Sequence, residues 1–187
     1  MMTLELVKPS MTTLPGFVDA LRRGWSRDNI GLEKTIRADL AWIAKDAAGF
    51  LASLDDIEAA GRPITLPDGS QARRLPGYNR WLWDGEFCGS IGLRWEPGTS
   101  SLPEHVFGHT GYAVVPWKRN RGYASAALRL MLPQARAVGL TSLELTTDPD
   151  NIASQRVIIN NGGDLIEEFE MPAAYGEGVK LRYRIAL

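Results

Sequence analysis

The chain has little of what several classes of protein require. One cysteine, Cys88, stands among 187 residues, so an internal disulfide framework or a cysteine-built metal site is excluded. Its two histidines, His105 and His109, leave little material for a zinc centre. Lysine and arginine number 21 against 22 aspartates and glutamates, and the net charge is −1. Without an excess of positive charge, we expect no nonspecific binding to nucleic acid or to a membrane surface.

Long hydrophobic runs are also missing. No apolar segment approaches the roughly 20 residues that a membrane helix needs. Residues 1–10 lack the basic segment and apolar core of a secretory signal, so a cytoplasmic protein is expected. The chain does have an ordinary globular composition, with 44% hydrophobic and 23% charged residues. Its length suits one domain over residues 1–187.

The spacing of apolar residues predicts which segments are helices and which are strands. Helical spacing predicts helices over 15–25, 35–54, 122–138 and 152–160. Alternation predicts strands over 3–7, 78–83, 87–95, 107–115, 142–146, 164–170 and 180–187. Asp84-Gly85 favours a hairpin between the second and third strands, and 63–76 is a turn-rich loop. This order predicts an α/β domain with a central mixed sheet flanked by helices, in which residues 1–75 form a helical flank.

A basic loop before a helix is the strongest chemical feature of the sequence. Lys118, Arg119 and Arg121 concentrate positive charge in a nearly neutral chain. Gly122 then opens an alanine-rich helix, whose first turn offers unpaired N–H groups and a partial positive charge. The pattern predicts an anion site, with phosphate as the best-fitting anion. A solvated basic turn is the alternative.

Residues 119–124, Arg-Asn-Arg-Gly-Tyr-Ala, resemble the Arg/Gln-x-x-Gly-x-Gly/Ala motif of the GNAT N-acetyltransferase superfamily. A strand ending in Val-x-Pro precedes them, as in that family. The resemblance covers residues 78–187 and implies the acyl-CoA N-acyltransferase fold, whose mixed sheet is mostly antiparallel. It also implies acetyl-CoA as cosubstrate, no metal, and a grip on the pyrophosphate by this loop. The residues then expected to bind acetyl-CoA are Val114, Val115, Arg119, Asn120, Arg121, Gly122, Tyr123, Ala124 and Ser125.

A second motif lies further along the chain. Asn151 and Ser154 match the family's Asn-x-x-Ser/Ala helix, and Asn161-Gly162 matches the turn that follows it. The resemblance implies that Asn151 and Ser154 contact the CoA arm. A local explanation is that Asn151 caps the helix. The cap and the contact with CoA are compatible.

The reaction implied by the resemblance is attack of a neutral amine on the acetyl thioester. An alkylamine has a pKa near 10.4 and must first lose a proton. Many relatives use a tyrosine after the Asn motif as the acid that protonates the thiolate, but this chain has Ile158 there. Tyr112 and Tyr175 are the replacement candidates, and solvent is the alternative. The candidate bases are His109, His105 and Glu104, each of which could instead be structural or solvated.

The resemblance implies transfer to a primary amine of a small molecule or an amino-acid-like acceptor. Two alternatives stay open: an inactive acyl-CoA sensor, favoured by Ile158, and an acetyltransferase of protein N-termini or lysines. Arg73, Arg74 and Arg80 could bind an anionic acceptor, although exposed arginines are usually solvated. The six tryptophans could form an aromatic acceptor pocket but are more typical of core packing. Exposed final strands are compatible with a homodimer.

Overall fold

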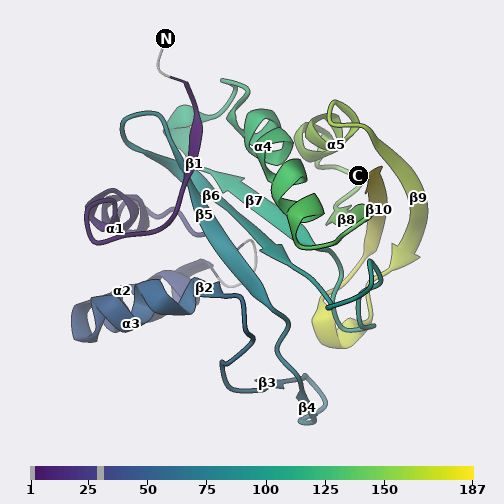
Figure 1. Cartoon of the computed structure of the whole chain (residues 1–187), viewed down its shortest axis with the longest axis horizontal. Coiled ribbons are helices and arrows are strands. Elements are labelled where there is room, and N and C mark those ends of the chain that lie inside the picture. The colour runs from purple at the N-terminus through teal and green to yellow at the C-terminus, as the bar shows by residue number, and fades with distance from the viewer. Residues whose placement is uncertain (1–2, 29–31) are drawn as a thin grey trace.

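The computed structural model of the chain describes residues 3–28 and 32–187, and two sheets with flanking helices form its framework (Figure 1). The first sheet has the strand order β1-β5-β6-β7, and β2 pairs with β5 beside this path. Its strands are β1 (Glu5–Val7), β2 (Asp55–Asp56), β5 (Gly77–Trp83), β6 (Phe87–Arg94) and β7 (Thr110–Val114). The predicted hairpin at Asp84-Gly85 joins β5 to β6 and is confirmed. Because β7 ends the order, one of its edges is open.

The second sheet is formed by the C-terminal strands, in the order β8-β10-β9. They are β8 (Ser142–Thr147), β9 (Gly163–Glu170) and β10 (Val179–Ala186). Every strand pair within residues 3–28 and 32–187 is antiparallel, and the strands of the expected central sheet are divided between two sheets. The two sheets touch where the His109 N–H donates to the Glu144 oxygen at 2.8 Å. Beyond this contact the two sheets are separate, since no further backbone hydrogen bond joins β7 to β8 in the described segments.

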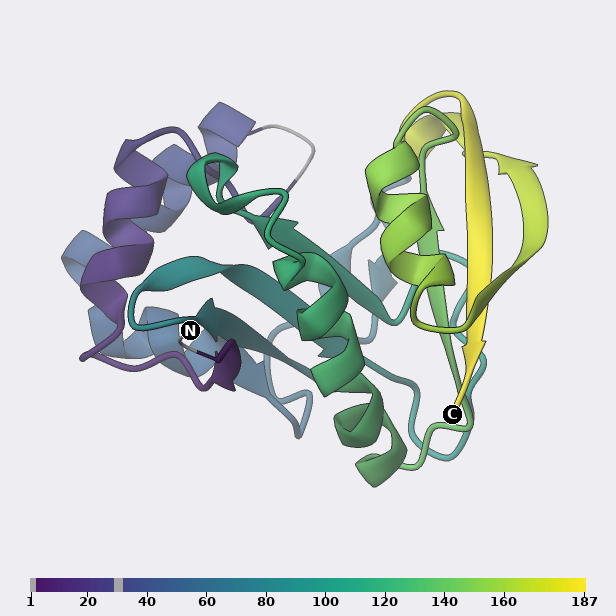
Figure 2. The same ribbon diagram turned by 90° about the horizontal axis from the view of Figure 1, so that it is seen from above.

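Helices cover both faces of the first sheet (Figures 1 and 2). The N-terminal helices are α1 (Leu14–Arg22), α2 (Leu32–Lys45) and α3 (Ala47–Ser53). The later helices are α4 (Tyr123–Ala137) and α5 (Ile152–Ile159), with 3₁₀ turns η1 (Pro116–Lys118) and η2 (Ala173–Tyr175). None of the helices in the described segments combines the length and apolar character that crossing a bilayer requires.

Neighbouring residues of one strand point into two separate cores. Leu82 packs with the buried residues of α4 and of the second sheet, whereas Trp81 packs with the N-terminal helices. The second core is aromatic: the Phe17 ring stacks on the Trp81 ring, with centroids 4.9 Å apart, and meets the Trp25 ring edge-on at 5.8 Å. Because Trp25 and Trp81 are almost fully buried there, they are packing residues.

The N-terminal flank differs from the prediction in two places. One helix was expected over 35–54, but Asp46 divides it into α2 and α3, and its carboxylate accepts the Gly49 N–H at 2.8 Å. The apolar spacing continues across this break, so only the capping residue marks it. The expected loop over 63–76 holds a short hairpin, β3 (Ile64–Thr65) and β4 (Gln71–Ala72).

Candidate functional site

A cavity of about 620 Å³ opens between the free edge of β7, α4, α5 and β8; we call it the α4–α5 cavity. It contains most of the residues that the sequence predicts to bind acetyl-CoA. These are Val114, Arg119, Asn120, Gly122, Tyr123, Ala124, Ser125, Asn151 and Ser154. Four segments of the chain, 110–114, 118–125, 145–148 and 151–160, therefore contribute to the walls of this cavity.

The loop before α4 forms a cradle of backbone N–H groups. Asn120 and Gly122 have positive φ angles of 61° and 76°, and Gly122 is the N-cap of α4, with no side chain capping the helix. The N–H groups of residues 120–125 have no acceptor among the described residues. A left-handed loop followed by a helix N-terminus presents several such donors to one anion. The loop therefore has free donors suited to the anion that the basic residues predict.

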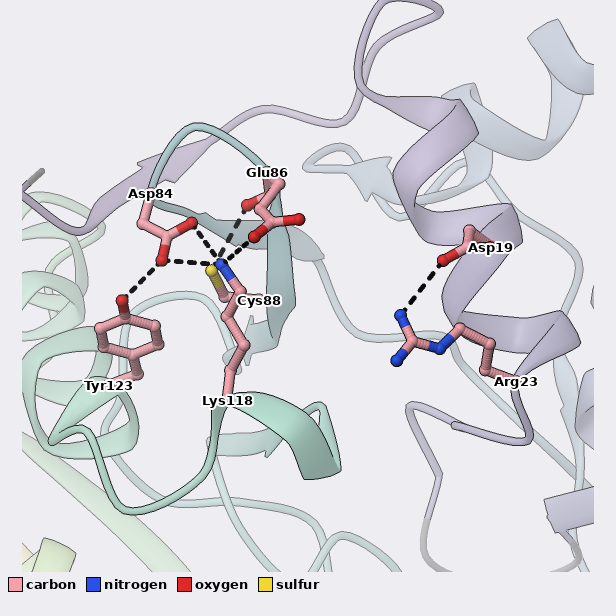
Figure 3. A network of polar contacts seen from close by, with 7 residues as sticks. All are labelled: Asp19, Arg23, Asp84, Glu86, Cys88, Lys118 and Tyr123. Atoms are coloured by element: carbon pink, nitrogen blue, oxygen red, sulfur yellow. Dashed lines mark hydrogen bonds and ion pairs between the residues drawn. The ribbon is translucent and has the colours of Figure 1, made fainter.

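A buried ion pair fixes this loop to the β5–β6 hairpin (Figure 3). The Lys118 ammonium donates to both carboxylate oxygens of Asp84, at 2.7 and 2.8 Å, and pairs with Glu86 at 2.7 Å. The Tyr123 hydroxyl donates to Asp84 at 2.5 Å. Burial would raise the pKa of Asp84, but the hydrogen bonds from Lys118 and Tyr123 outweigh it and lower the pKa to about 2. Lys118 is thus held by carboxylates, although the sequence grouped it with the phosphate-binding charges.

Two predicted cofactor residues do not line the α4–α5 cavity. Val115 is fully buried in the second core, and its N–H donates to Cys88. Arg121 is exposed on the outside of the loop. Arg119 does line the cavity, and its Nε donates to the Val114 oxygen at 3.3 Å. Alternation along the strand explains Val115, because Val114 and Val115 must point to opposite faces.

Tyr112 is the candidate acid that the structure brings to the α4–α5 cavity. Its hydroxyl lies 3.0 Å from Ser154 Oγ, on α5. Ile158 is one turn further along α5, buried and in the cavity wall, so the Tyr112 hydroxyl meets the helix face that carries Ile158. Burial raises the pKa of Tyr112 to about 12. At neutral pH this group is a hydrogen-bond donor rather than a base.

Two asparagines organise α5. Asn151 caps the helix, and its Oδ1 accepts the Ser154 N–H at 3.1 Å, as the local explanation predicts. Asn161 was assigned no role from the sequence, yet its Nδ2 donates to Ser125 Oγ at 3.1 Å and to the Val157 oxygen at 2.8 Å. It therefore ties the end of α5 to the first turn of α4. The Asn-Gly turn of the second motif could have indicated this role of Asn161 from the sequence.

A second cavity, of about 490 Å³, lies against β5 and β6; we call it the β5–β6 cavity. Ser90, Gly92 and Arg94 from one face of β6 line it, together with segments from the N-terminal flank. Both cavities include Gly111 and Tyr112 in their walls. Gly111 pairs with Gly92, and a Cβ at Gly111 would meet nothing within 4 Å. The two cavities thus adjoin at a stretch of bare backbone.

His109 lines the β5–β6 cavity, where its ring is a hydrogen-bond donor rather than the base that we expected. Its Nδ1 accepts the Glu144 N–H at 2.9 Å, so the ring proton is on Nε2, which has no partner among the described residues. Burial lowers the pKa of His109 to about 4. The group is fully buried and neutral at pH 7. These properties count against its expected role as a base.

Two other predicted catalytic residues lie outside both cavities. The Tyr175 ring packs edge-on against Phe107, with centroids 5.2 Å apart. Glu104 is exposed on the loop before β7. His105 does line the β5–β6 cavity, and its Nε2 is buried without a partner in the described segments. The structure therefore brings together Tyr112, His105 and His109, and leaves out Tyr175 and Glu104.

Comparisons with solved structures identify the fold. This chain is similar in structure to an acetyltransferase from Agrobacterium tumefaciens C58 (18% identity, TM-score 0.53, covering 98% of this chain and 91% of that chain). It is also similar to the microcin C7 self-immunity acetyltransferase MccE in complex with acetyl-CoA and AMP (9% identity, TM-score 0.64, covering 98% of this chain and 92% of that chain). A third is the ribosomal L7/L12 alpha-N-protein acetyltransferase RimL in complex with CoA (14% identity, TM-score 0.63, 100% and 96%).

Comparison with curated protein sequences gives no significant match. A family model described as an acetyltransferase (GNAT) domain matches residues 35–164, which is more than half of the chain. The resemblance drawn from the two motifs is thereby confirmed, and so is the fold that it implies. The chain belongs to the GNAT acetyltransferase family and is an acetyl-CoA-dependent N-acetyltransferase.

Proposed function

We propose that acetyl-CoA binds in the α4–α5 cavity and that a small primary amine reaches it from the β5–β6 cavity. The observation that carries this proposal is the pair of residues, Gly111 and Tyr112, that both cavities share. Two ligands can meet only where their cavities adjoin. The missing side chain at Gly111 leaves room for the acetyl group and the amine at this point.

The fit of acetyl-CoA to the α4–α5 cavity rests on two sets of free backbone groups. The N–H groups of residues 120–125 suit the pyrophosphate. The open edge of β7 suits the pantetheine arm, whose amides can pair with it as an added strand would. Asn151 and Ser154 lie on the opposite side of the same cavity, beside this path.

The chemistry is direct transfer. The nitrogen lone pair of the neutral amine attacks the thioester carbonyl, the C–N bond forms and the C–S bond breaks. CoA leaves as the thiolate, and the amine proton passes through water to that thiolate. Tyr112 is the only tyrosine hydroxyl in the described segments that we place beside the reacting atoms, and it donates a hydrogen bond to the developing charge. Holding the amine and the thioester together supplies much of the remaining rate.

Gly122→Asp tests the proposed cofactor site. The substitution places a carboxylate at the N-terminus of α4, where the pyrophosphate should lie, and strains a residue with φ of 76°. We expect micromolar binding of acetyl-CoA to the wild-type protein by isothermal titration and no measurable binding to the variant. Gly139→Asp is the matched control, because Gly139 has φ of 91° in the turn after α4 and lines neither cavity. Equal affinities of the wild type and Gly122→Asp would place acetyl-CoA elsewhere.

The size of the preferred acceptor distinguishes a small-amine acetyltransferase from an acetyltransferase of protein N-termini. A cavity of about 490 Å³ falls in the range that encloses a small molecule. A screen of small amines against peptides with free N-termini, in the presence of acetyl-CoA, measures the preference directly. Faster acetylation of the peptides would favour the protein acetyltransferase alternative, which RimL represents among the similar folds.

A further inference from the structure

The β5–β6 cavity contains one arginine without a carboxylate partner. Arg27 donates to both oxygens of Asp39, Arg73 pairs with Glu96, and Arg74 pairs with Asp56 at 4.0 Å. Arg80, which the sequence offered as an anion-binding residue, pairs with Asp55 at 2.9 Å and does not line the cavity. Arg94 has no ion pair with any residue in the described segments.

The Arg94 guanidinium has one hydrogen bond at the cavity wall. Arg94 is exposed, and its Nε donates to the Gly108 oxygen at 2.8 Å, while its two terminal nitrogens have no protein acceptor in the described segments. The remaining acid of the cavity, Asp28, accepts the Thr35 hydroxyl at 3.4 Å and interacts with the Arg94 charge without an ion-pair contact. A guanidinium with two free terminal nitrogens can bind a carboxylate through two hydrogen bonds.

His109 lies in the same wall. It is fully buried, and its Nε2–H makes no hydrogen bond of normal geometry with the described residues, although the Ser100 backbone interacts with the ring. The backbone N–H of Arg94 donates to the His109 oxygen, so the two residues are neighbours across β6 and β7. A buried donor without a partner costs free energy unless a ligand or water satisfies it. The open donors at this end of the cavity are therefore the terminal nitrogens of Arg94, and they suit an acceptor-rich group.

The position of these donors relative to Gly111 limits the size of the ligand. Arg94 is two residues from Gly92 along β6, and Gly92 pairs with Gly111. Two residues of strand span about 7 Å. An amine at Gly111 and an anionic group on Arg94 therefore fit on one small molecule, of the size of an amino acid.

We infer that the acceptor is a small amine that carries a carboxylate, and that Arg94 binds this carboxylate. The inference rests on the proposed function, because it names the class of acceptor for the same site. Arg94 then selects the acceptor, whereas Tyr112 and the loop of residues 119–125 serve the acetyl donor. Acceptors without a negative charge leave the guanidinium unpaired and are poor substrates.

The experiment compares free amino acids with the corresponding amino acid amides, which keep the amine and lose the charge. For the best amino acid of the panel, we expect kcat/KM to exceed that of its amide by about 10- to 100-fold in the wild type. In Arg94→Gln, the ratio of the two kcat/KM values should fall to about one, and the affinity for acetyl-CoA should stay unchanged. Arg129→Gln is the matched control, because Arg129 is exposed on α4 and lines neither cavity. A ratio near one in the wild type, or an unchanged ratio in Arg94→Gln, would overturn the inference.

A binding measurement keeps this test separate from that of the proposed function. The Arg94 Nε–H signal in a nitrogen-resolved NMR spectrum is identified by its loss in Arg94→Gln. We expect an amino acid from the panel to shift it, and the amide of that amino acid to leave it in place. This shift is readable even if no acetyl group is transferred, so failed catalysis with an intact shift would reject the proposed function alone. No shift with any amino acid, with CoA bound, would reject the carboxylate site.

Discussion

Tyr112 and Ile158 illustrate how a hydroxyl proposed for catalysis can come from a strand where many relatives supply it from a helix. The sequence places an isoleucine where relatives have a tyrosine, and this was the feature that favoured an inactive binding module. In the structure, the Tyr112 hydroxyl approaches α5 from β7 and contacts Ser154, one turn before Ile158. The Tyr112 hydroxyl on β7 can therefore occupy the position beside α5 where Ile158 provides only an apolar side chain.

Tyr112→Phe removes only this hydroxyl. We expect kcat to fall roughly 100-fold, because one hydrogen-bond donor to the developing charge is lost. The affinity for acetyl-CoA should change little, and both are measured by steady-state kinetics and titration. Tyr175→Phe is the matched control, since that ring packs on Phe107 outside both cavities and should keep the wild-type rate. Wild-type turnover by Tyr112→Phe would show that the hydroxyl is not used.

The lowered pKa of His109 predicts how the free energy of unfolding depends on pH. Burial lowers its pKa to about 4 in the folded state, against 6.5 for the free side chain. The unfolded chain therefore binds more protons between these values, so stability is complete above pH 6.5 and falls as the pH decreases through 4. We expect this group to contribute a loss of about 3 kcal/mol in the free energy of unfolding over that window.

The measurement is denaturant unfolding between pH 4 and pH 8. In His109→Asn, the amide oxygen can still accept the Glu144 N–H, but the titrating ring is gone. The variant should lack this component of the pH dependence. If wild type and variant lose stability in parallel, other groups are responsible.

At the scale of elements, the β5–β6 hairpin supports the loop that we propose to bind acetyl-CoA. Asp84 in the hairpin turn accepts hydrogen bonds from Lys118 and Tyr123, which lie on either side of the loop (Figure 3). The turn itself could be predicted from Asp84-Gly85, because turn chemistry is local. The ion pair could not, since Lys118 is 34 residues away and its charge suggested phosphate binding instead.

Asp84→Asn tests this support. The loop should lose order, and the dissociation constant for acetyl-CoA should rise roughly tenfold, a cost of about 1.4 kcal/mol. The kcat at saturating acetyl-CoA should change much less. Asp55→Asn is the control, because Asp55 also binds two cations, Lys8 and Arg80, but lines neither cavity. A similar loss of affinity in both variants would indicate general destabilisation.

At the scale of the whole molecule, the part of the site made by one continuous segment was predictable, and the part assembled from distant segments was not. The loop before α4 carries its residue types, spacing and helix N-terminus within a few positions, so the sequence suffices for it. The β5–β6 cavity draws residues from Arg27 to Tyr112, and its arginines differ only in their partners. Those partners depend on packing between the N-terminal flank and the sheet, which periodicity does not encode.

The same reasoning explains the two sheets. Local alternation identified each strand near its observed bounds, but it contains no information on which edges pair. Contact between β7 and β8 ends near His109 and Glu144, and the sequence of neither strand marks that point. The division of the sheet is what opens the edge of β7, so the least predictable feature of the fold creates the site.

The bare stretch at Gly111 has a consequence for the order of events in the proposed reaction. The two cavities share only this part of β7 and are otherwise lined by different elements, so the proposed sites give each substrate its own entrance. We expect that neither bound substrate obstructs the entry of the other and that both are present before transfer begins. The expected kinetic mechanism is a ternary complex with random order of addition, in which the two products leave by separate exits.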